Sequence, residues 1–331
     1  MRKILIIVLV LVGSCVYAQD TYYTQFFANK LDLNPAFAGS RYHHRIIANY
    51  RNQWDKFNNP FMTYAVSYDC YMDNFGGLGI QIQQDRQANG AQITTSMAGV
   101  YSYMMKISHN TALRFAISCG VINNHLDPTN LVYSDMIDID RGFIGGHDGS
   151  SDPVVYDKKA LDVGVGALFN IEKYTFGVSA KHLSEPSIAF TTKSVIPIKY
   201  VFHAGAEYPI SFNGLRDVAF TFCPLFMFQM QDDNKQMNYG FYINKFNLSA
   251  GTWFRQNFKM KYDSMIFMLA FDNKFFRLGY SYDLAVNRLT PAGGNVHELS
   301  LIFLFGSRKK SHRASQVPCP RFFGKQNYLE L

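Results

Sequence analysis

Seven aspartates and four glycines lie in the stretch Asn123–Lys159, where they could bind a metal ion. Closely spaced carboxylates beside glycines can hold Ca²⁺ through oxygen ligands. The spacing matches no complete calcium loop, because the bidentate glutamate of an EF-hand is missing. Two interpretations stay open: a calcium-binding loop, and a metal-free loop that is solvated or plugs the interior of the molecule.

The nine histidines could serve as metal ligands or as the base of a nucleophilic triad. His43 and His44 are adjacent, so along an extended chain they face opposite sides and do not easily share a metal. His182 lies two residues before Ser184, but the sequence has no Gly-x-Ser-x-Gly elbow. No helix is expected after Gly76–Gly79, which excludes a phosphate-binding loop. The sequence predicts no cofactor, no metal and no catalytic residue; a hydrolase stays an alternative with little support.

The first 18 residues have the pattern of a secretory signal peptide. Arg2 and Lys3 precede the apolar run Ile4–Val12, and Val16-Tyr17-Ala18 offers a small-residue cleavage site. A second interpretation makes Cys15 the acylated cysteine of a lipoprotein. After either cleavage, no run of about 18 uncharged apolar residues remains to cross a bilayer as a helix.

The last regular segment, Val296–Phe305, alternates like a β-strand with one apolar face. Leu299, Leu301, Phe303 and Phe305 share that face, because successive strand side chains point to opposite sides. Phe275–Leu284 repeats the pattern. Alternating segments of about ten residues that end in aromatics are typical of transmembrane barrel strands.

The composition favours strands over membrane helices. Aromatic residues make up 16% and charged residues 17%, while the mean hydropathy is −0.10, so apolar residues are interleaved with polar ones. Fourteen extended segments are predicted, an even number as in bacterial barrels. They are Tyr42–Tyr50, Phe61–Cys70, Gly77–Asp85, Gln92–Met105, Thr111–Ile122, Ala160–Ile171, Tyr174–Lys181, Ile198–Tyr208, Val218–Met230, Met237–Phe246, Asn247–Gln256, Ser264–Phe271, Phe275–Leu284 and Val296–Phe305.

The connections between these segments sort by length. If the first strand begins on the periplasmic side, every connection longer than about ten residues falls outside, as in bacterial barrels. An open sheet edge cannot persist in hydrocarbon, since each unpaired backbone group costs several kcal/mol. We therefore expect the first and last segments to pair. The sequence predicts an all-β fold, a transmembrane antiparallel β-barrel over residues 42–306, closed by the strand that carries Leu299, Leu301, Phe303 and Phe305.

Two segments are expected outside the wall, both in the periplasm: a leader (residues 19–41) and a basic tail (residues 307–331). Because the chain is exported, its net charge of +7 favours acidic lipid or a partner protein and excludes nucleic acid. The tail contains Cys319-Pro320-Arg321-Phe322, and Arg and Phe are enriched at interface cores. A disordered tail is the alternative.

Further features carry structural expectations. Trp54 and Trp253 are expected in the interfacial aromatic belt of the barrel. Cys70, Cys119 and Cys223 are too widely spaced for a metal site or a dense disulfide framework, so we expect free thiols.

Several motifs, in their order along the chain, resemble the PorP/SprF family of Bacteroidetes outer-membrane proteins, which is associated with type IX secretion and gliding motility. The resemblance spans nearly the whole mature chain. It rests on Gln25-Phe26-Phe27, Leu33-Asn34-Pro35-Ala36-Phe37-Ala38-Gly39-Ser40, Gln53-Trp54, Pro60-Phe61-Met62-Thr63-Tyr64, Ser67-Tyr68-Asp69, Phe276-Arg277-Leu278-Gly279-Tyr280-Ser281-Tyr282-Asp283, His297-Glu298 and Cys319-Pro320-Arg321-Phe322.

The resemblance implies a non-enzymatic barrel that works with the type IX machine. Either it is a core component that contacts periplasmic subunits or peptidoglycan-linked lipoproteins, or it is the partner of a secreted surface adhesin. The leader residues Asn34 and Pro35 and the tail residues Cys319–Phe322 are then candidate partner-binding residues. A passive porin is the alternative function, because a barrel of fourteen strands is wide enough for an aqueous lumen.

Overall fold

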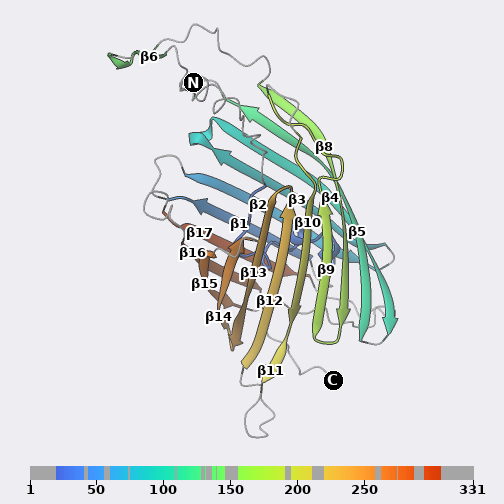
Figure 1. Ribbon diagram of the computed structural model, residues 1–331. Helices are drawn as coiled ribbons and strands as arrows, with labels where there is room; N and C mark the ends of the chain where they lie inside the picture. The colour runs from blue at the N-terminus through green and yellow to red at the C-terminus, as the bar shows by residue number, and fades with distance from the viewer. Residues whose placement is uncertain are drawn as a thin grey trace, which may run out of the picture.

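The computed structural model describes residues 20–40, 44–55, 60–73, 75–108, 110–127, 131, 136–138, 140–145, 156–190, 195–210, 220–257, 262–273, 275–286 and 294–306. Over these residues the chain forms an antiparallel β-barrel whose tilted strands surround one lumen (Figure 1). The wall strands are β1 (His44–Gln53), β2 (Phe61–Met72), β3 (Gly76–Gln87), β4 (Gln92–Ser108), β5 (Thr111–Leu126), β8 (Asp157–Ile171), β9 (Tyr174–Lys181), β10 (Lys199–Ala206), β11 (Tyr208–Ile210), β12 (Phe220–Gln231), β13 (Asn234–Lys245), β14 (Leu248–Asn257), β15 (Tyr262–Asp272), β16 (Phe276–Ala285) and β17 (Val296–Phe305).

The wall has fourteen positions. The sheet contains fifteen strands, but β10 and β11 both pair with β12 and share one position, interrupted only at Glu207. Each of the fourteen predicted segments has a strand at its place, so the predicted fold class is confirmed. A separate hairpin of β6 (Ile137–Asp138) and β7 (Gly142–Phe143) lies in the connection between β5 and β8.

Strands β1 and β17 close the barrel, as the sequence predicts. They pair antiparallel, with His44 opposite Phe305 and Gln53 opposite Val296. We call this pair the seam. Leu299, Leu301, Phe303 and Phe305 lie on its outer face, where Leu299, Phe303 and Phe305 are exposed.

The outer face of the wall is apolar. Side chains such as Leu269, Phe115 and Phe176 are 65%, 48% and 48% exposed, whereas the inward Arg114 of β5 is 1% exposed. An apolar surface that covers the strands of a closed barrel is suited to lipid and not to water. Among the described helices, none has the length and apolar character to cross a membrane.

The two ends of the barrel differ in their connections. The end where β1 begins and β17 finishes has the connections 73–75, 109–110, 172–173, 211–219, 246–247 and 273–275, and we call it the turn end. The opposite end has the three longest connections, 127–156, 182–198 and 286–295, and we call it the loop end. The predicted sorting of connections by length is therefore confirmed, while the side of the membrane that each end faces stays a prediction.

The described leader, residues 20–40, lies inside the barrel. It contains the short helix α2 (Lys30–Leu33) and the 3-10 turn η1 (Pro35–Phe37). Phe27 and Phe37 are 1% and 0% exposed, in one apolar cluster with wall residues such as Leu168 and Trp253. The expectation that the leader lies outside the wall is therefore wrong, because its apolar side chains form the core of the lumen.

Candidate functional site

The candidate functional site is the lumen occupied by the leader, which runs from the loop end to the turn end. Asp20 contacts His182, just after β9, and Lys199, the first residue of β10, both at the loop end. At the other end of the leader, the Gly39 N–H donates to Asp69 of β2, near the turn end. Because β17 finishes at the turn end, the described part of the leader begins at the opposite end of the barrel from the end of β17, and the side of the membrane that each chain end faces stays a prediction.

An ionic cluster holds the leader at the loop end. Asp20 Oδ2 lies 2.9 Å from His182 Nε2 and 3.4 Å from Lys199 Nζ. The other ring nitrogen of His182 lies 3.0 Å from Asp162 Oδ1 on β8. This cluster ties the leader to three consecutive parts of the wall.

The charges in this cluster stabilise one another. Burial lowers the pKa of His182, but the Asp20 and Asp162 carboxylates outweigh burial and raise the pKa to about 9. Burial raises the pKa of Asp20, but Lys199 and His182 outweigh it and hold the pKa far below its usual value. The imidazole is therefore an imidazolium at neutral pH.

At the seam, the wall binds the backbone of Thr24 and Gln25. The Glu298 carboxylate of β17 accepts the N–H of Thr24 at 2.7 Å and the N–H of Gln25 at 3.1 Å. The Gln25 amide donates to the Glu298 carbonyl at 2.9 Å and accepts from the Ser300 hydroxyl at 2.6 Å. Arg51 Nη1 of β1 donates to Thr24 Oγ1 at 2.8 Å and lies 3.7 Å from Glu298 Oε2.

Aromatic side chains fill the middle of the lumen. The Phe27 ring meets the Trp253 ring edge to face at 5.0 Å and lies 6.0 Å from the Tyr242 ring. Trp253 Nε1 donates to the Thr24 carbonyl at 3.2 Å, and its side chain is 1% exposed. The predicted place of Trp253 in the interfacial belt is therefore wrong. Trp54 lies at the loop end, where its partly exposed ring packs against the Phe61 ring with 4.9 Å between the two centroids.

The Asn34-Pro35 turn fits a shaped part of the wall. Asn34 Nδ2 donates to the carbonyls of Ala167 on β8 and Val178 on β9, both at 3.0 Å, and its Oδ1 accepts from the Ala36 N–H at 2.9 Å. A Cβ on Gly166 would lie 2.1 Å from Asn34 Oδ1, so glycine is needed at this inward position of β8.

A second ionic group holds the leader near the turn end. Arg45 of β1 and Asp69 of β2 pair through Nε and Oδ1 at 2.7 Å, and both are at most 2% exposed. Arg45 also donates to the Phe37 carbonyl at 3.2 Å. Nearby, the Ser102 hydroxyl of β4 donates to the Ala38 carbonyl at 2.7 Å. The leader is therefore fixed by polar contacts at both ends and by an apolar core between them.

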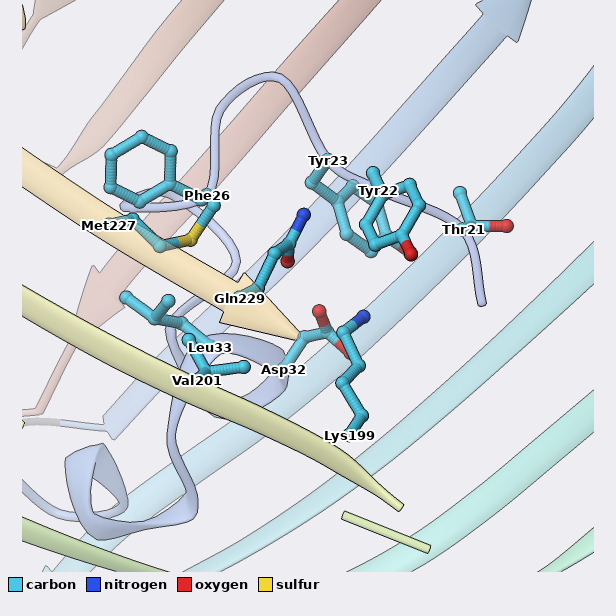
Figure 2. Close-up of a pocket in the computed structure, with 10 residues that line it drawn as sticks. All are labelled: Thr21, Tyr22, Tyr23, Phe26, Asp32, Leu33, Lys199, Val201, Met227 and Gln229. Atoms are coloured by element: carbon cyan, nitrogen blue, oxygen red, sulfur yellow. The ribbon is translucent and has the colours of Figure 1, made fainter. Parts of the chain in front are cut away.

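A small cavity lies between the leader and strands β10 and β12 (Figure 2). Its volume is about 20 Å³, which suffices for about one water molecule. Tyr22, Tyr23 and Asp32 of the leader face it, together with Lys199 and Gln229 of the wall. The cavity is too small for a solute.

The structure brings together few of the sequence-predicted site residues. Asn34 and Pro35 are buried in the lumen, so partner binding by them stays a prediction that requires the leader to leave it. Cys15, Cys319, Pro320, Arg321 and Phe322 lie outside the described residues. About half of Asn123–Lys159 is described, and there Asp138 Oδ1 accepts the N–H groups of Asp140 and Arg141.

The other chemical candidates show no site in the described part of the chain. It contains no group of three or more His, Cys, Asp or Glu side chains that could hold a metal. Ser184 donates to the Leu161 carbonyl at 2.8 Å, while both His182 ring nitrogens face carboxylates, so the two do not form a nucleophile and base pair. Cys70, Cys119 and Cys223 are free, as expected.

The wall residues that bind the leader, among them Glu298, Ser300 and Asp69, were not predicted from the sequence as site residues. Their signal was present in the strand alternation, since each lies on the polar, inward face of its strand. A charged residue on that face is buried only if something fills the lumen.

Residues 15–303 of the chain are matched by the family model described as the type IX secretion system membrane protein PorP/SprF. The chain belongs to the PorP/SprF family. This match confirms the resemblance noted in the sequence. Membership of a type IX secretion membrane family, together with the barrel fold, agrees with an outer-membrane location. No curated protein matches the chain at a significant level.

Several solved structures align with this PorP/SprF chain at low sequence identity and low TM-score. Omp33 of Acinetobacter baumannii is 8% identical with a TM-score of 0.44, covering 81% of this chain and 100% of its own. BamA of Haemophilus ducreyi, lacking POTRA domains 1-3, is 9% identical with a TM-score of 0.41, covering 79% and 70%. The KdgM porin, in complex with disordered oligogalacturonate, is 8% identical with a TM-score of 0.39, covering 79% and 99%. These similarities concern the fold alone.

Proposed function

We propose that this PorP/SprF protein is a sealed, non-enzymatic barrel that couples partners of the type IX secretion machinery to the outer membrane. The observation that carries the proposal is the filled lumen, where Phe27, Phe37 and Trp253 belong to one buried apolar core. A barrel whose interior is packed with its own chain is suited to anchoring and not to the passage of solutes. Family membership supports the link to type IX secretion.

The contact with partners is proposed to lie in the basic tail, Ser307–Leu331, which follows Gly306 at the turn end. Long connections gather at the opposite end, and bacterial barrels keep their short turns in the periplasm, which favours a periplasmic tail. The partner is then a periplasmic type IX subunit or a peptidoglycan-binding lipoprotein. A secreted surface adhesin is the other proposed partner, and it would meet the loop end.

Deletion of residues 307–331 tests the role of the tail. We expect the shortened barrel to insert normally and protein export by the type IX route to stop. Arg321→Ala with Phe322→Ala is expected to lower the co-purification of periplasmic subunits on a tag placed after Glu185, while Arg313→Ala serves as the control. Normal export by the deletion variant would refute the role of the tail.

A conductance measurement separates this proposal from the passive porin. The purified full-length protein is expected to stay silent in planar bilayers, because the leader fills its lumen. Steady single-channel conductance of the intact protein would favour the porin instead. A separate pull-down of the tagged barrel from native outer membranes tests whether secretion subunits co-purify with it.

A further inference from the structure

The seam joins the first and the last strand of the wall, so no turn or loop connects its two strands directly. Consecutive strands are joined by a turn or loop, and a short turn fixes their register. Strands β1 and β17 have no such connection. Some other contact must therefore select the register in which the barrel closes.

The outer face of the seam discriminates poorly between registers. Leu299, Leu301 and Phe303 lie opposite Tyr50, Ala48 and Ile46, so lipid-facing side chains meet lipid-facing side chains. If the two strands slipped by two residues, lipid-facing side chains would again lie opposite each other. The energetic difference between registers must therefore come from the inner face.

The inner face of the seam carries the buried apolar pair Ile47 and Ile302 together with buried polar residues, and the polar residues bind the leader. Arg51 and Glu298 lie directly opposite each other, and both belong to the most buried polar residues, at 3% and 0% exposed. A slip of one residue would turn Glu298 toward lipid. A slip of two would move it about 7 Å along the strand, out of reach of its present partners.

Those partners are the backbone groups of Thr24 and Gln25. Two successive N–H groups donate to the Glu298 carboxylate, and the Thr24 hydroxyl accepts from Arg51 on the other strand. The Gln25 side chain adds two bonds to β17, one of them to a backbone carbonyl. One dipeptide therefore contacts both strands of the seam, and in one register only.

We propose that Thr24-Gln25 is an internal peptide clamp that binds both strands of the seam and selects their register when the barrel closes. The inner face of the seam is thus a peptide-binding site, which recognises an extended backbone through Glu298 and an amide side chain through Ser300. The leader occupies this site within the same chain.

A cross-linking experiment in the full-length chain tests the clamp. In a background without native cysteines, Ala48→Cys with Leu301→Cys reports the observed register, and Ala48→Cys with Phe303→Cys reports a slip of two residues. The protein is refolded into micelles, oxidised and analysed on a non-reducing gel. The ratio of the two cross-links measures the choice of register.

Glu298→Gln is expected to move this ratio toward the slipped register by at least about fivefold, because the bonds to a charged acceptor are weakened. The matched control is Asp85→Asn, which changes a carboxylate of β3 that accepts the hydroxyl of Thr21 in the leader at 2.9 Å and is separated from the seam by β2. The control is expected to leave the ratio unchanged. Equal effects of the two variants would overturn the proposal.

A second experiment changes the clamp within the full-length chain. Gln25→Ala removes the bonds to the Glu298 carbonyl and the Ser300 hydroxyl, and it is expected to move the cross-link ratio in the same direction as Glu298→Gln. Thr21→Ala removes a leader hydroxyl that donates to Asp85 of β3, and as the control it is expected to leave the ratio unchanged. If Gln25→Ala leaves the ratio unchanged, or Thr21→Ala moves it equally, Thr24-Gln25 is not the clamp.

Discussion

Asp20 enters the lumen at a point where the wall presents positive charge. His182 and Lys199 contact its carboxylate, and Asp162 holds the far side of the imidazole. A buried charge is costly unless it is paired, so each member of this cluster depends on the others. The leader is attached at the loop end by charge more than by apolar contact, which makes this attachment sensitive to pH.

The pKa of His182 is raised from 6.5 to about 9, so the stability it contributes is complete below about pH 6.5 and is lost as the pH rises through about 9. The loss is at most roughly 3 kcal/mol. We expect the thermal unfolding midpoint in micelles to fall between about pH 7 and pH 10, and to fall less in His182→Asn. His125→Asn, in a pair with Asp157 that is exposed on both sides, is the control and should behave as the wild type. An unchanged pH profile in His182→Asn would contradict this role.

Individual elements of the wall are shaped for the leader. Strand β8 carries Gly166 where the Asn34-Pro35 turn approaches, and strand β3 carries Gly77, where a Cβ would lie 2.1 Å from the Ala38 carbonyl oxygen. Gly166 meets the side chains of Asn34 and Pro35, and Gly77 meets the Ala38 backbone, so both positions require glycine. The wall and the leader therefore form one packed unit.

Gly166→Val is expected to destabilise the folded barrel by about 1–3 kcal/mol, because its side chain would overlap Asn34 and Pro35. Gly99→Val is the control, since a Cβ there meets nothing closer than the Cys119 carbonyl oxygen at 3.9 Å. Denaturant unfolding in lipid vesicles measures both variants. A loss of equal size in Gly99→Val would show that the strand, and not the leader, is disturbed.

The strands could be predicted from the sequence because a barrel wall forces a period of two on every strand. Val296–Phe305 shows this period, and its structure follows the pattern residue by residue. The place of the leader could not be predicted in this way, because its side chains contact the wall on all sides and its sequence therefore shows no period. Trp253 shares the face of Arg255 and Gly251, so the same alternation could have placed it inside.

At the scale of the molecule, the leader adds one further passage through the barrel to the fourteen of the wall. Asp20 lies at the loop end and Gly306 at the turn end. The described chain therefore starts and finishes at opposite ends of the barrel. If the turn end faces the periplasm, the start of the leader reaches the cell surface.

An epitope placed before Asp20 tests this arrangement in intact cells. We expect it to be accessible from the same side as an epitope after Glu185, in the long connection 182–198, and to stay accessible in intact cells when an epitope in the turn 172–173 is protected. The two reference positions belong to the two ends of the barrel. If the leader epitope were accessible only when the epitope in the turn 172–173 is accessible, the arrangement would be refuted.

The course of the leader also determines how the molecule responds to force. A pull between Asp20 and Gly306 would act along the barrel axis, parallel to the leader. The contacts at Glu298, Asn34 and Asp69 lie at successive depths, so the pull would stress them together, in shear, and not one after another as in peeling. Contacts stressed in parallel share the force and yield at a higher tension. A barrel threaded in this way can transmit tension across the membrane through its own chain.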